Sequence, residues 1–66
     1  MIINIFAPAA DRKFVEQQQG PEFNILSTYY YSSEGSDILF IVDTVPEIMS
    51  YFTLKYGKEN IYIWIR

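Results

Sequence analysis

The sequence predicts a small α+β domain, in which an antiparallel sheet of ferredoxin-like βαββαβ order carries two helices on one face as a two-layer sandwich. Four segments have the composition of strands, and one has the apolar period of a helix. The connections 7–22 and 44–59 are each sixteen residues long, which suits a helical crossover between parallel strands. If the first helix is only a loop, the alternative is a three- or four-stranded antiparallel sheet with a single helix at 45–56.

Residues 1–6 predict the first strand, because most of them are large and apolar. Pro8 should end it, since proline restricts the residue before it and has no N–H for the ladder. A short helix is then expected from an Asp11 cap to about residue 19, where Gly20-Pro21 stops it. Its apolar stripe is thin, so an irregular loop over 9–19 remains an alternative.

Residues 23–31, FNILSTYYY, and 38–43, ILFIVD, predict a β-hairpin. Both are rich in aromatic and β-branched types, and the segment 32–36 between them has turn chemistry, with Gly35 available for a positive φ. The register stays open, so either Tyr29 and Tyr31 or Tyr30 would face away from the helices.

The second helix is the clearest element. Thr44 and Glu47 fit a capping box, and a proline stands in the first turn. Gly57 should end the helix, and Leu54 lies opposite its core stripe. That stripe, at a spacing of 100° per residue, consists of Val45, Ile48, Met49, Phe52 and Tyr56.

The chain ends in IYIWIR, residues 61–66, which predicts a last strand beside the first. Because successive side chains alternate between faces, the isoleucines at 61, 63 and 65 should pack under the helices. Tyr62, Trp64 and Arg66 would then lie on the uncovered face, with Ile2, Asn4 and Phe6 of the first strand.

Composition narrows the function classes. The 66 residues, expected to be a single compact domain over 1–66, include neither cysteine nor histidine and carry a net charge of −3. The longest apolar run, 38–42, is far below the ~20 residues of a membrane span, and the first residues do not resemble a secretory signal. A cytoplasmic protein without membrane insertion is expected, and so small a core makes association with itself or a partner valuable.

Catalysis is not expected. Without histidine and cysteine the usual general base, thiolate nucleophile and zinc ligands are missing. The nearest carboxylate pairs, Glu34 with Asp37 and Asp43 with Glu47, are interpreted as solvated turn charges and helix capping. The three glycines are isolated, so no phosphate-binding loop exists. We expect no enzyme, no catalytic residue, no metal and no cofactor.

The aromatic content, 18% of residues, instead favours a non-catalytic interaction protein. A narrower hypothesis is a small inhibitor, of the kind that viruses and mobile elements use against a host enzyme or defence complex. Acidic side chains would then meet a basic surface of that target; the candidates are Asp11, Glu16, Glu22, Glu34, Asp37 and Glu59. The candidate partner-binding residues are Tyr62, Trp64, Arg66, Tyr29, Tyr30, Tyr31, Phe6 and Leu54.

Two alternatives stay open. A single-stranded nucleic-acid platform would stack bases on the same aromatics, as RNA-recognition modules do. Against it, the basic residues are few and scattered, and the module's signature is missing from 38–43, so nucleic acid is an unlikely partner. The other alternative is a homodimeric structural or regulatory subunit.

Overall fold

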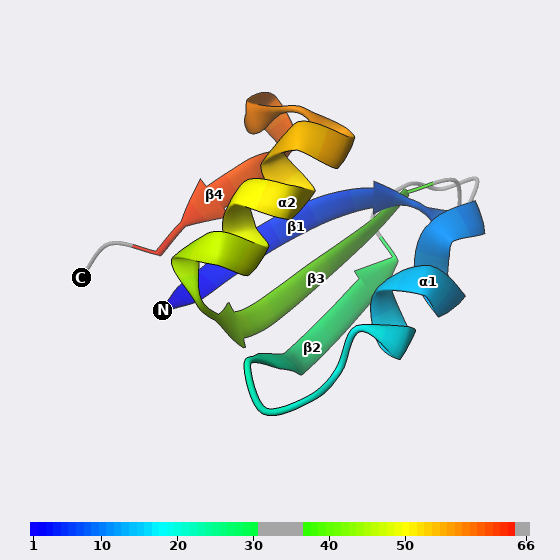
Figure 1. Ribbon diagram of the computed structural model, residues 1–66. Coiled ribbons are helices and arrows are strands. Elements are labelled where there is room, and N and C mark those ends of the chain that lie inside the picture. The colour runs from blue at the N-terminus through cyan, green and yellow to red at the C-terminus, as the bar shows by residue number, and fades with distance from the viewer. Residues whose placement is uncertain (31–36, 65–66) are drawn as a thin grey trace.

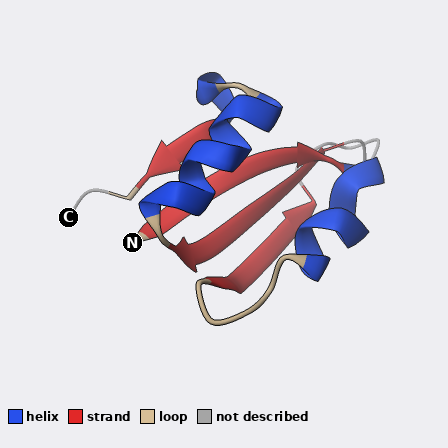
Figure 2. Cartoon of the chain, in the orientation of Figure 1, coloured by secondary structure: helices blue, strands red, loops and turns tan. Residues whose placement is uncertain are grey.

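The computed structural model describes residues 1–30 and 37–64 and shows an α+β fold: a four-stranded antiparallel sheet with two α-helices (Figure 1). The strands are β1 (Ile2–Pro8), β2 (Phe23–Tyr30), β3 (Asp37–Thr44) and β4 (Ile61–Ile63), in the order β2-β3-β1-β4. The helices are α1 (Arg12–Gln17) and α2 (Pro46–Tyr56), each with a short 3-10 turn beside it, η1 (Ala9–Asp11) and η2 (Lys58–Asn60) (Figure 2).

The central strand is β1. It pairs along its whole length with β3, from Ile2 opposite Asp43 to Pro8 opposite Asp37, and the last strand pairs with it on the other side, as predicted. The β2–β3 hairpin is also confirmed. Its predicted loop, 32–36, lies outside the described residues.

The core lies between the sheet and the two helices, which occupy the same side of it (Figure 1). Val15 of α1 and Phe52 of α2 are fully buried. The Phe52 ring stacks on Phe23 of β2 at 5.2 Å between centroids, and it meets Phe14 of α1 at 6.4 Å. One aromatic side chain of α2 therefore holds both helices and the sheet edge together.

The helix α2 carries the predicted stripe, since Ile48, Met49 and Tyr56 pack beside Phe52 while Leu54 is 89% exposed. It ends at Gly57 as predicted, because the backbone there has φ = 90°, which glycine adopts without a Cβ clash.

The predicted capping box at the start of α2 is wrong, and the predicted cap of α1 is correct in position only. Thr44 is the last residue of β3 and is buried; its hydroxyl donates to the Glu22 carbonyl at 2.7 Å. Its backbone N–H donates to the Met1 carbonyl at 2.8 Å, so the Glu47 carboxylate cannot take that N–H as a capping box requires. Val45 takes the N-cap position without a side-chain hydrogen bond. Asp11 occupies the N-cap position of α1, as predicted, but its side chain makes no cap bond; its carboxylate accepts a hydrogen bond from the Tyr56 hydroxyl at 2.8 Å.

The predicted isoleucine row of the last strand is correct only at its start. Ile61 is 8% exposed and belongs to the core, whereas Ile63 is 50% exposed. The reason is the shortness of β4, which pairs with only Ile3–Ile5 of β1 and lies at the sheet edge. Ile65 lies outside the described residues.

The first helix is shorter than predicted. It begins directly after Asp11, as predicted, with a 3-10 turn before it, but it ends at Gln17 instead of at about residue 19. Because Val15 is the only buried side chain of α1, little apolar contact is available to lengthen it.

Candidate protein-binding surface

The sheet has an uncovered face, defined by the alternation of its strands. Ile3, Ile5 and Ala7 of β1 and Ile38, Phe40 and Val42 of β3 are buried against the helices. The residues between them therefore point to the opposite side. We call that side the open face; it consists of Ile2, Asn4, Phe6, Asn24, Ser27, Tyr29, Asp37, Leu39, Ile41, Asp43, Tyr62 and Trp64.

A β-bulge decides which tyrosine of β2 joins the open face. Ile25 pairs with Val42, but Ser27 pairs with Ile41, so Leu26 is an extra residue in the ladder. Beyond the bulge, Tyr29 stands opposite Leu39 and points to the open face, where it is 54% exposed. The predicted choice between registers is settled in favour of Tyr29, with Leu39 and Ile41 beside it.

Three aromatic side chains gather where β1 meets β4. Phe6 and Tyr62 contact edge to face, with centroids 5.7 Å apart and planes at 87°. Trp64 continues the ladder, since its backbone N–H donates to the Ile2 carbonyl at 3.0 Å, and its indole Nε1–H donates to the Asn4 side chain. About half of Tyr62 and of Trp64 remains exposed. These rings are therefore both oriented and accessible.

Charge is distributed unevenly between the two layers. The described lysines and arginines, Arg12, Lys13, Lys55 and Lys58, all belong to α1, α2 and η2. The charged side chains of the open face are two carboxylates at the ends of the β3 row, Asp37 and Asp43, both exposed. Within 1–30 and 37–64 the only ion pair joins Asp43 to the Met1 ammonium at 3.1 Å.

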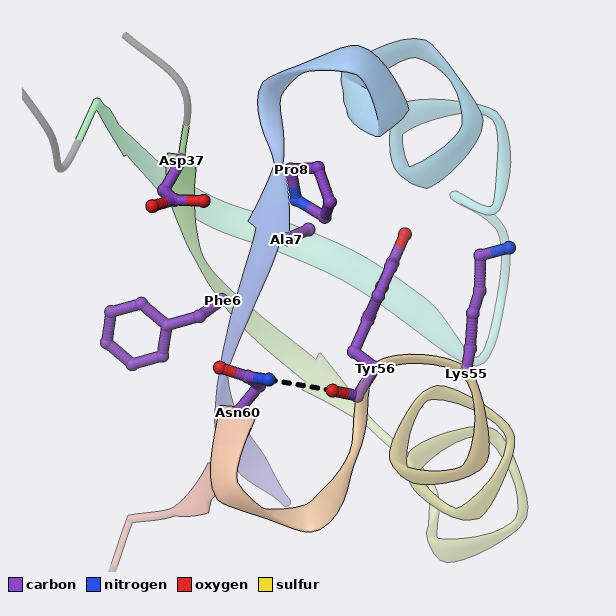
Figure 3. A pocket seen from close by; sticks show the side chains of 7 residues that line it. All are labelled: Phe6, Ala7, Pro8, Asp37, Lys55, Tyr56 and Asn60. Carbon is purple, nitrogen blue, oxygen red and sulfur yellow. Dashed lines mark hydrogen bonds between the residues drawn. The ribbon is translucent and has the colours of Figure 1, made fainter. Parts of the chain in front are cut away.

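A hollow lies at each end of that row. The first, about 380 Å³, is lined by Phe6, Ala7, Pro8, Asp37, Lys55, Tyr56 and Asn60. Figure 3 shows Phe6 and Asp37 on one side of β1, with Tyr56 and Lys55 on the other. The second, about 430 Å³, contains Glu22 and Asp43 among its lining residues, Gly20, Pro21, Glu22, Asn24, Asp43, Thr44 and Val45.

The other predicted binding residues do not join this surface. Tyr30 accepts a 2.7 Å hydrogen bond from Arg12 of α1, which raises the pKa of that guanidinium. Leu54 lies on the exposed side of α2. Tyr31 and Arg66 lie outside the described residues.

The predicted acidic set is scattered. Only Asp37 lies on the open face; Asp11 and Glu16 belong to η1 and α1, Glu22 precedes β2, and Glu59 belongs to η2. Glu34 lies outside the described residues. Asp43 as an open-face carboxylate and Asn4 as the partner of Trp64 were not predicted, although strand alternation places both on this face.

The hydroxyl of Tyr56 lies inside the helix layer. Burial and the hydrogen bond to Asp11 raise the pKa of this phenol. The bond joins the end of α2 to η1, so Tyr56 acts in packing the two crossovers together.

The described part of the chain contains no group of three histidine, cysteine, aspartate or glutamate residues that could hold a metal ion, and no buried side-chain polar atom there lacks a hydrogen-bond partner. No helix among the described residues is long and apolar enough to cross a bilayer. No family model, curated protein or solved structure gives a match to this chain.

Proposed function

We propose that the protein is a non-catalytic interaction protein that binds another protein through the open face. The observation that carries this proposal is the aromatic corner of Phe6, Tyr62 and Trp64 on a sheet face that none of the described helices covers. Tyrosine and tryptophan anchor interfaces because they offer large, rigid contact area with a polar tip.

The setting of these rings favours tight contact. Tyr62 is placed by a strand and by the Phe6 ring, and Trp64 is held by its bond to Asn4. A side chain already ordered before binding loses less rotamer entropy in the complex, where each immobilised side chain costs about 0.5–1.5 kcal/mol. Leu39 and Ile41 extend the apolar surface across the middle of the sheet.

A narrower form of the proposal is a small cytoplasmic inhibitor, of the type that viruses and mobile elements direct at a host protein, with a basic region of the target as its binding site. Its support is the acidic balance of the chain, −3, and the two open-face carboxylates. We also propose that the fold is a variant of the ferredoxin-like arrangement, supported by the order β2-β3-β1-β4.

The test is affinity capture from a lysate of the host cells, with wild type and three variants compared. Trp64→Ala and Tyr29→Ala each remove one ring from opposite sides of the open face. We expect each to weaken capture of the same partner by more than about 1 kcal/mol, the usual loss at an interface anchor. Leu54→Ala, at an 89% exposed position of α2, should leave capture unchanged.

Circular dichroism of each variant must match the wild type, so that lost binding is not lost folding. Tyr29 is useful here, because half of its surface is exposed and its removal leaves the aromatic corner intact. Capture that survives both open-face substitutions but is lost in Leu54→Ala would contradict the proposal and move the interface to the helix layer.

A further inference from the structure

We infer that the partner meets the open face with an apolar segment that carries basic side chains toward both of its ends. This inference rests on the proposed function and adds the chemistry of the partner. The two carboxylates of the β3 row, Asp37 and Asp43, lie on either side of the apolar residues Leu39 and Ile41. Each would then face a lysine or arginine.

The spacing sets the length of such a segment. Asp43 lies six positions after Asp37, which corresponds to about 20 Å along a strand at ~3.3 Å per residue. An extended peptide spans this distance with about six residues, and a helix with about thirteen, at 1.5 Å per residue. Both lengths are typical of segments that one protein presents to another.

The hollows at the ends of β3 give long basic side chains a place to lie. Two acidic residues, Glu22 and Asp43, line the 430 Å³ hollow. In the 380 Å³ hollow, Asp37 and the Phe6 ring occupy the open-face side of β1 (Figure 3). An aromatic face beside a carboxylate suits a guanidinium or ammonium group.

One cation of the protein already lies near each end of the β3 row. Lys55 also lines the 380 Å³ hollow, but it lies on the helix side, with its ammonium 4.5 Å from the Phe14 centroid. At the other end, the Met1 ammonium donates to Oδ1 of Asp43 at 3.1 Å, so an incoming basic side chain would meet the other oxygen of Asp43 and the neighbouring Glu22. Phosphate groups would meet two carboxylates on this face, which disfavours a nucleic acid.

The experiment is selection from a random-sequence linear peptide library displayed on phage. The wild type is compared with the double variant Asp37→Lys/Asp43→Lys and with Glu16→Lys/Glu47→Lys. Glu16 and Glu47 are exposed positions of α1 and α2, so the two double variants change the net charge equally.

We expect wild type and the helix-layer control to enrich the same peptides, with apolar centres and lysine or arginine toward both ends. The Asp37→Lys/Asp43→Lys variant should bind those peptides at least about fivefold more weakly at low salt, because attraction becomes like-charge repulsion. The difference should shrink as salt screens the charges.

If the wild type selects neutral or acidic peptides, the inference of a basic partner is wrong. It is also wrong if both double variants lose peptide binding to the same extent. If binding of those peptides is still lost in Trp64→Ala, the proposed function survives that result. If the selected peptides bind Trp64→Ala and Tyr29→Ala as tightly as the wild type, or if the library yields no binder, both the inference and the proposed function are wrong. A wild-type dimer that buries the open face would contradict a basic partner.

Discussion

The ring of Phe52 offers the sharpest test of how the helix layer is held to the sheet. The side chain is 0% exposed and contacts four rings: it stacks on Phe23 at 5.2 Å and on Tyr56 at 5.9 Å, and it meets Phe14 and Tyr51 edge to face. Phe52→Leu keeps an apolar core but removes these aromatic pairs, each worth about 0.5–1.5 kcal/mol. Because the pairs share one ring and are not additive, we expect a loss of about 2 kcal/mol in unfolding free energy.

That loss is large for this chain. At about 0.05–0.15 kcal/mol per residue, 66 residues give a total stability of roughly 3–10 kcal/mol. With a urea slope of about 1 kcal/mol/M, the midpoint should fall by about 2 M in a melt followed by circular dichroism. Tyr51→Leu is the matched control, since Tyr51 is 49% exposed, and it should shift the midpoint by less than about half as much. Equal shifts in the two variants would refute the account of Phe52 as the central ring.

Two further predictions concern hydrogen bonds. Thr44→Val removes the 2.7 Å bond to the Glu22 carbonyl and should lower the free energy of unfolding by about 1 kcal/mol in a urea melt. Glu47→Gln should lower it by almost nothing, and the reverse ranking would show that Glu47 does cap α2. Tyr56 has a raised pKa in the folded state, so its contribution is complete below about pH 10, the unfolded value, and is lost as pH rises through the folded value. Urea melts should show a steeper alkaline decline for wild type than for Tyr56→Phe, and equal slopes would contradict this role.

The sequence predicted the sheet and α2 well because their patterns are strong and local. Alternation placed Ile3 and Ile5 in the core and Phe6 outside, and the helical period placed Phe52 inward and Leu54 outward. The pairing of the first and last strands followed from the two long connections.

What the sequence could not predict depends on how the strands pair and on what lies next to each side chain in the fold. Thr44 suits a helix cap, but the end of β3 buries it, and the Glu22 carbonyl lies within reach of its hydroxyl. The bulge at Leu26 depends on how β2 pairs with β3, so a single-strand pattern could not choose between Tyr29 and Tyr30. Ile63 has the right alternation, but it lies near the end of an edge strand.

The most direct test of the open face as the binding surface is photo-crosslinking of the captured partner. A photoreactive phenylalanine analogue replaces Tyr62, Tyr29 or Leu54 in turn; all three side chains are exposed, at 52%, 54% and 89%. We expect a crosslink to the partner from positions 62 and 29 and none from position 54. A crosslink from position 54 alone would contradict it, because the partner would then lie on α2.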